Sequence, residues 1–137
     1  MATNETRLSP LRAVLQNLEP RSDEVIGDFY NRLFAARPEY KALFESTDWP
    51  KQRRMLLGSL VLALENLEEP EAVRETLRGF GRTHEPFKLS LADYRQFGAL
   101  LRDALAEHSG DAWTPEVEKA WWAAYDELLE TMFPSGL

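Results

Sequence analysis

Residues 50–67 read PKQRRMLLGSLVLALENL, and this stretch is the clearest indication of the fold. Its apolar side chains recur every three or four residues, which is the spacing of one face of an α-helix. A proline at the start suits the first turn of a helix, where its missing N–H is not needed. The stretch therefore predicts a helix with a wide buried face, made by Leu56, Leu57, Leu60, Val61, Leu64 and Leu67.

The rest of the chain repeats this pattern between widely spaced prolines and glycines. No segment alternates apolar and polar residues for long enough to form a strand. We therefore expect an all-α fold of about seven or eight helices, in one domain spanning residues 1–137. A loop is expected at residues 45–49, and the expected helices begin near Leu8, Ser22, Pro38, Pro50, Pro70, Ser90 and Thr114. Ser22 is a cap-type residue, Ser90 with Asp93 resembles a capping box, and Thr114 is a cap followed by a first-turn proline. The side chains expected on the inner face of the last helix are Val117, Trp121, Ala124, Leu128 and Met132.

Composition limits the classes of function. The 137 residues carry 16 basic and 23 acidic side chains, a net charge of -7, and no cysteine. Negative charge repels phosphate backbones and anionic lipids, so nucleic acid and membranes are poor partners. The lack of cysteine excludes disulfides, thiol nucleophiles and thiolate metal sites. No apolar run approaches the ~20 residues that span a bilayer, and no secretory signal is visible, so we expect a cytoplasmic protein.

His84 is the most informative candidate residue. The chain has only two histidines, which excludes a multi-histidine zinc site. His84 falls on the apolar stripe of its helix, four residues after Phe80 and seven after Leu77. It is then either a core histidine near a helix C-terminus or a single axial ligand to a haem iron, which needs one imidazole facing an apolar slot. The residues by themselves leave both interpretations open.

Three other polar residues have similar alternatives. Gln52 lies four residues before Leu56, on the inward face of its helix, but it can equally be a solvated helix start. Tyr30 can point inward or keep its hydroxyl in water at the boundary. His108 lies at a helix C-terminus, where the dipole favours its charged form, and a structural role is the simpler interpretation.

Taken together, these residues resemble the bacterial globins, above all the globin part of the flavohaemoglobins. The similarity runs from about residue 8 to residue 133, and the order and spacing of its segments make it specific. The segments that carry it are Phe29–Phe34, Arg37–Glu39, Leu43–Phe44, Gln52–Leu57, Glu65–Leu67, Gly81–His84, Tyr94, Gly98, Leu100–Leu101, Trp113–Glu116, Ala120–Trp121 and Ala124–Tyr125.

The resemblance implies a haem b site with two sides. On the distal side, Tyr30 and Gln52 take the places of the ligand-binding tyrosine and glutamine, and Leu56 takes the apolar position one turn on. Phe44 takes the place of the phenylalanine that packs on the haem ring.

On the proximal side, the resemblance implies that His84 is the ligand to the haem iron, with Tyr94 nearby. Phe87 is also expected among the haem-binding residues. Phe87 and Lys88 depart from the family, which often has Tyr-Gly at these two positions, so a proximal hydroxyl is missing. Arg53, Arg54 and Lys88 are candidates for the haem propionates by proximity in the sequence alone.

The implied function is binding of dioxygen, nitric oxide or carbon monoxide at the iron. Two neutral donors at about 0.5–1.5 kcal/mol each would slow oxygen release on the order of 10- to 100-fold. Conversion of nitric oxide to nitrate is a further activity, and it would need an external reductase. The alternative is a globin-fold sensor or interaction module, with or without haem, that acts through a partner protein.

Overall fold

A computed structural model describes residues 4–65, 78–79, 81–82, 84 and 88–133. Every regular element in this part of the chain is helical, which confirms the all-α expectation. Of the helix expected from Pro70, residues 70–77 lie outside the described part, and 78–79, 81–82 and 84 are helical. The α-helices are α1 (Asn4–Leu18), α2 (Ser22–Ala36), α3 (Trp49–Glu65), α5 (Leu91–Ser109) and α6 (Pro115–Met132), and the short 3-10 helices are η1 (Glu19–Arg21), η2 (Pro38–Phe44) and η4 (Gly110–Ala112).

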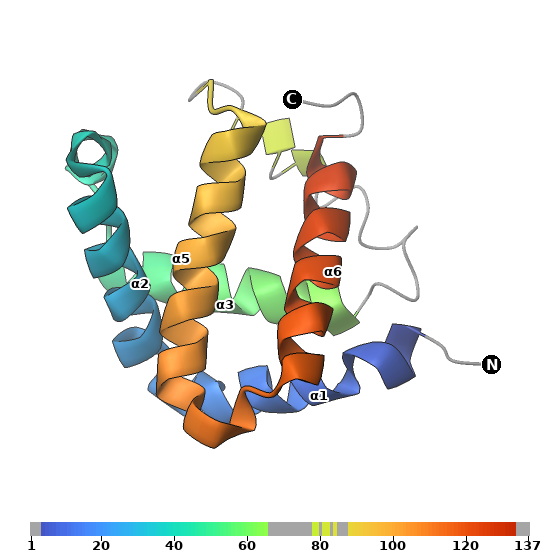
Figure 1. Ribbon diagram of the computed structural model, residues 1–137. Coiled ribbons are helices and arrows are strands. Elements are labelled where there is room, and N and C mark those ends of the chain that lie inside the picture. The colour runs from blue at the N-terminus through green and yellow to red at the C-terminus, as the bar shows by residue number, and fades with distance from the viewer. Residues whose placement is uncertain (1–3, 66–77, 80, 83, 85–87, 134–137) are drawn as a thin grey trace.

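The helices pack around one apolar core. Figure 1 shows α5 between α2 and α6, with α6 running antiparallel to α5. Helix α3 passes behind them, and α1 crosses near the lower ends of α5 and α6 (Figure 1). Most of the apolar area removed from water belongs to side chains where these helices meet. The largest fully buried side chains are Leu11, Leu15, Leu18, Val25, Ile26, Leu105, Val117 and Trp121.

Two helix starts follow the predicted capping chemistry. At the start of α5, the Ser90 side chain accepts from the Asp93 N–H and the Asp93 carboxylate accepts from the Ser90 N–H, so the capping box is complete. At the start of α6, Thr114 Oγ1 accepts from the Val117 N–H at 3.2 Å, and Pro115 occupies the first turn.

Some expected boundaries are wrong by a few residues. Helix α3 begins at Trp49, inside the expected loop, and the Trp49 ring stacks on Phe44. Ser22 opens α2 but its side chain makes no cap, because its backbone already has helical angles. On α6, Leu128 and Met132 were expected inside and are half-buried, whereas Leu129 is buried.

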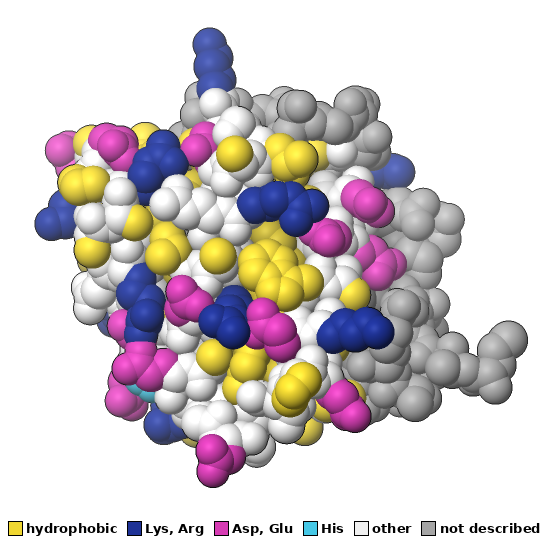
Figure 2. Space-filling model, viewed as in Figure 1, with side chains coloured by type: hydrophobic (Ala, Val, Ile, Leu, Met, Phe, Trp, Pro, Cys, Tyr) yellow, Lys and Arg dark blue, Asp and Glu magenta, His cyan; other side chains and the backbone are white. Residues whose placement is uncertain are grey.

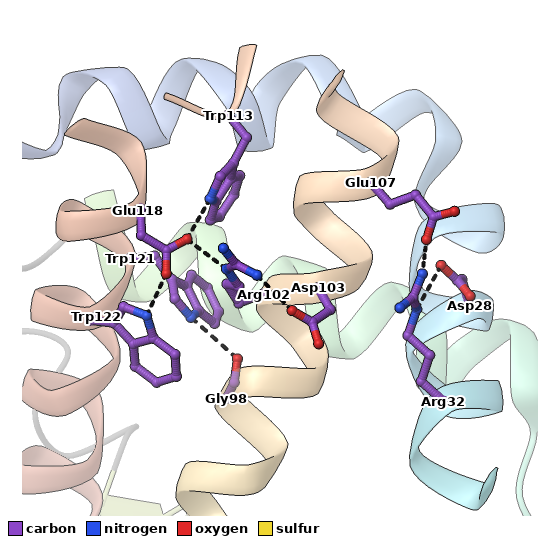
Figure 3. Close-up of polar contacts among 10 residues, drawn as sticks. All are labelled: Asp28, Arg32, Gly98, Arg102, Asp103, Glu107, Trp113, Glu118, Trp121 and Trp122. Carbon is purple, nitrogen blue, oxygen red and sulfur yellow. Dashed lines mark hydrogen bonds and ion pairs between the residues drawn. The ribbon is translucent and has the colours of Figure 1, made fainter. Parts of the chain in front are cut away.

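The carboxylate of Glu118 joins α6 to α5 and to Trp113, the residue that follows η4 (Figure 3). Glu118 Oε1 accepts from Trp113 Nε1 at 2.7 Å and from Arg102 Nε at 2.6 Å, and Oε2 accepts from Trp122 Nε1 at 2.8 Å. Burial raises the pKa of the Glu118 carboxyl, but these three hydrogen bonds together lower it below its usual value. The carboxylate is therefore charged at neutral pH and holds the two helices in register.

The surface mixes both signs of charge. Figure 2 shows lysine and arginine side chains interleaved with aspartate and glutamate on the face viewed, with apolar side chains between them. In the part of the chain that the structure describes, the exposed large apolar side chains are Leu43, Met55 and Leu91. Among the described residues, no helix combines the length and apolar character needed to cross a membrane.

Candidate functional site

A hydrogen bond joins the two residues expected on the distal side. Tyr30 lies on α2 with 6% of its surface exposed, so it points inward. Gln52 lies in the first turn of α3 and is half-buried. Its Nε2 donates to the Tyr30 hydroxyl oxygen at 2.9 Å. The structure thus brings together two polar side chains from different helices.

This contact determines which protons are left for other acceptors. Because Gln52 donates to the Tyr30 oxygen, the Tyr30 hydroxyl proton can be donated to a further group. Burial raises the pKa of Tyr30, and the hydrogen bond from Gln52 offsets part of that rise. The hydroxyl therefore stays protonated at neutral pH and keeps its donor.

An aromatic cluster surrounds the Tyr30 ring. Its centroid lies 5.5 Å from that of Phe44, 6.0 Å from that of Phe34 and 5.0 Å from that of Trp49. Phe44 on η2 and Leu56 on α3 are both half-buried and pack against the core. Leu56 lies one turn after Gln52. Trp49 is a further member of this cluster that was not predicted, because its position was expected to be a loop. These side chains form an apolar wall beside two neutral hydrogen-bond donors.

On the expected proximal side, the structure describes His84 and leaves Phe87 outside the described residues. His84 is helical and half-buried, rather than fully on the buried stripe. Three residues earlier, Gly81 is buried against the end of α6, where a Cβ would lie 2.1 Å from the Met132 carbonyl oxygen. The chain near His84 therefore touches α6 backbone to backbone.

Tyr94 is anchored by α6 as well. It lies in the first turn of α5 with 5% of its surface exposed, and its ring centroid lies 5.1 Å from that of Phe133. Its carbonyl oxygen accepts from the Tyr125 hydroxyl at 2.5 Å. Burial raises the pKa of Tyr94 to about 12, and the nearby Asp93 charge adds to the rise. Tyr125 could be predicted as a family residue, but this hydrogen bond could not.

Two of the remaining candidates, Arg53 and His108, have structural partners. Arg53 Nε lies 3.4 Å from Asp23 Oδ1, so it pairs α3 with α2. Lys88 is exposed and has a positive φ of 51°. His108 Nε2 lies 3.3 Å from Asp28 Oδ2 at the far end of α5, in keeping with the structural interpretation. Arg54 is exposed on α3.

The family model for globins matches residues 27–132, which run from α2 to the end of α6. This chain belongs to the globin family. The globin matches include the flavohemoprotein of Deinococcus radiodurans, which is 31% identical over 124 residues, covering 89% of this chain and 31% of that protein. The flavohemoprotein of Bacillus subtilis is 27% identical over 132 residues, covering 95% and 33%.

The chain spans about a third of the length of these relatives. A solved structure with the same fold is an engineered carbene transferase based on a protein assigned as a nitric oxide dioxygenase, from Rhodothermus marinus. It has a TM-score of 0.75 and 26% identity, and the match covers 93% of this globin and 88% of that chain. The resemblance to the globin part of the flavohaemoglobins is therefore confirmed.

Proposed function

We propose that this globin binds haem b and takes dioxygen, nitric oxide or carbon monoxide at the haem iron, with His84 as the protein's ligand to the metal. The observation that carries the proposal is the 2.9 Å hydrogen bond between Gln52 and Tyr30 beside the aromatic cluster. A pair of neutral donors at an apolar wall suits a small, weakly polar ligand.

The side chains present fit a haem. An imidazole is the proximal ligand of globin haem, and His84 supplies one from a helical position. Half-buried apolar side chains on η2 and α3, namely Phe44, Trp49 and Leu56, offer surface for a flat porphyrin. Because the chain has no cysteine, thioether attachment is excluded, which favours a non-covalent haem b.

The distal residues would act by hydrogen bonding. When bound, haem supplies an iron with one coordination position open to a diatomic ligand. The Tyr30 hydroxyl would donate to that ligand, because its oxygen already accepts from Gln52. The second amide proton of Gln52 is a further donor. Two donors slow the escape of a ligand that carries partial negative charge.

Conversion of nitric oxide to nitrate is the finer form of this proposal. It is supported by the names of the relatives, which are flavohemoproteins, and of the structural neighbour, which is related to a nitric oxide dioxygenase. The electrons would come from an external reductase that carries its own redox cofactor. Nitric oxide consumption in the presence of a generic reductase, compared with its absence, tests this activity.

The first experiment is an absorption spectrum after reconstitution with haem. We expect a Soret band in the wild type that is lost in His84→Ala and kept in His108→Ala, since these are the two histidines of the chain. A band lost equally in both variants would contradict the assignment of His84. If the wild type shows no Soret band, the haem proposal is wrong and an interaction module becomes the better interpretation.

The second experiment measures oxygen dissociation. Tyr30→Phe and Gln52→Leu should each raise the rate about two- to tenfold, as expected for the loss of one neutral hydrogen bond. Because the two side chains touch, the double variant should change the rate by less than the product of the single effects. Trp122→Phe, which removes one hydrogen bond to Glu118 on α6, is the control and should leave the rate unchanged.

A further inference from the structure

Arg37 lies at the junction between two elements of the distal wall. It follows the end of α2, which carries Tyr30, and precedes Pro38, the first residue of η2. Its backbone leaves the helix, with φ at -135° and ψ at 75°, while its N–H donates to the Leu33 carbonyl oxygen at 2.7 Å. A shift of Arg37 therefore changes the connection between α2, which carries Tyr30, and η2, which ends at Phe44.

The Arg37 side chain crosses from this junction to the first turn of α5. Nη1 donates to Asp93 Oδ1 and to Gln96 Oε1, each at 2.9 Å. Nε donates to Glu39 Oε1 at 2.8 Å, so the guanidinium also binds η2 itself. A guanidinium suits this task because its donors form a rigid fork. One side chain thus connects both elements.

Asp93 is a firm anchor because α5 holds it independently. Its Oδ2 accepts from the Ser90 N–H at 2.9 Å, and the Asp93 N–H donates to Ser90 Oγ at 3.1 Å. The hydrogen bond from Ser90 and the Arg37 guanidinium lower the pKa of Asp93. The next residue along the chain is Tyr94, whose ring is buried. Arg37 is therefore bonded to the residue directly before Tyr94 in the chain.

A line of aromatic rings follows the same route. The Arg37 guanidinium carbon lies 4.6 Å from the centroid of the Tyr40 ring. Tyr40 packs on Phe97 with a centroid distance of 5.6 Å, and Phe97 packs on Tyr94 at 5.8 Å. A charge–ring contact and two edge contacts thus join Arg37 to Tyr94 a second time.

A second arginine joins the same two helices elsewhere. Arg32 on α2 pairs with Glu107 near the far end of α5 and with Asp28 on its own helix (Figure 3). Its side chain is 32% exposed, against 31% for Arg37, and each arginine contacts two carboxylates. Arg32 therefore provides a matched control for the docking of α2 on α5.

We infer that Arg37 is a positioning residue that holds the distal wall of Tyr30 and Phe44 in register with the proximal residue Tyr94. This inference rests on the proposed function, because it assigns distal and proximal roles to these residues. Arg37 acts through Asp93 and through the Tyr40 ring, without touching the ligand. Loss of Arg37 loosens η2 and the start of α5 together, whereas loss of Arg32 loosens neither.

The test combines two measurements on Arg37→Gln and Arg32→Gln. Hydrogen exchange should speed up on the order of three- to tenfold in Arg37→Gln at the amides of Tyr94 and Tyr40, the free-energy scale of a partly exposed ion pair in a network. These amides bond to the Ser90 and Arg37 carbonyls, so they report both ends of the connection. In the haem-loaded protein, the oxygen dissociation rate should rise by a similar factor. Arg37→Lys should raise the exchange rates and the oxygen dissociation rate less than Arg37→Gln does, because an ammonium can keep one of the two contacts to α5.

The outcomes separate this inference from the proposed function. Equal exchange at both amides in the two glutamine variants would overturn the inference. So would faster exchange in Arg37→Gln with an unchanged oxygen rate, because Arg37 would then have a purely structural role. A wild type without a Soret band would defeat the proposed function and this inference together. A normal Soret band with identical Arg37→Gln and Arg32→Gln variants would defeat this inference alone.

Discussion

Replacing Gly81 by alanine should disturb the chain beside His84 directly. A Cβ at this position would lie 2.1 Å from the Met132 carbonyl oxygen, 2.9 Å from the carbonyl carbon and 3.3 Å from the Cα. Ordinary contact between such atoms needs about 3.5 Å, so the two backbones must separate by roughly 1.4 Å. Neither side can relieve the clash by rotating a side chain, because all three Met132 atoms belong to the backbone.

Overpacking of this kind costs about 1–3 kcal/mol, and the better helix propensity of alanine returns about 0.5–1 kcal/mol. We therefore expect Gly81→Ala to lower the free energy of unfolding by up to about 2.5 kcal/mol. The separation should also reach His84, which lies three residues further along, so haem should dissociate faster. Urea unfolding and transfer of haem to an acceptor globin measure the two effects.

Gly79→Ala is the matched control. A Cβ there would lie 3.6 Å from Nη2 of the Arg82 side chain, which is ordinary contact with a flexible group. Because Gly79 is in a helical position, this variant should be more stable than the wild type by up to about 1 kcal/mol. The reasoning is refuted if Gly81→Ala matches Gly79→Ala in both urea midpoint and haem dissociation rate.

Three further variants, one of them with a matched control, have expected outcomes. Gly98→Ala would place its Cβ 2.6 Å from the Tyr125 ring, so it should destabilise the protein by about 1–3 kcal/mol in urea, while Gly58→Ala, with nothing within 4 Å, should not. Tyr94 has its pKa raised to about 12, so the stability it contributes is complete below pH 10 and is lost as the pH rises to about 12; Tyr94→Phe should flatten that alkaline decline in thermal unfolding. Glu118 has a lowered pKa, so its contribution is present above about pH 4.5 and is lost as the pH falls further; Glu118→Gln should cost about 1–2 kcal/mol at pH 7 and show a shallower acid transition.

Hydrogen bonds between residues within one helical turn were predicted correctly from the sequence. Ser90 and Asp93 form the expected capping box, and Thr114 caps α6, because these hydrogen bonds depend on residues three apart. The Ser22 side chain does not cap α2, because the preceding 3-10 helix η1 leaves Ser22 with helical backbone angles. The spacing of polar residues does not indicate that η1 is helical. Trp49 failed as a loop residue because its ring packs on Phe44, 5 residues earlier in the chain.

Contacts between distant segments were beyond a periodicity argument. Apolar spacing shows which face of a helix is buried, but not which helix that face meets. The pairing of Gln52 with Tyr30 was expected only through the family resemblance, and the structure shows the contact. Arg37 and Asp93 are 56 residues apart in the sequence, and nothing in the sequence near either residue predicts their hydrogen bond.

The shared carboxylate of Glu118 makes the order of substitutions matter as descendants of this chain diverge. Changing Trp122 to phenylalanine removes one donor and leaves the carboxylate with two others, Trp113 and Arg102. Changing Glu118 first to a residue without an acceptor leaves two indole N–H groups and a guanidinium competing for water, at about 1–3 kcal/mol for each group that water cannot reach. Lineages can therefore leave this arrangement one tryptophan at a time, whereas a path that begins at the glutamate passes through a less stable ancestor.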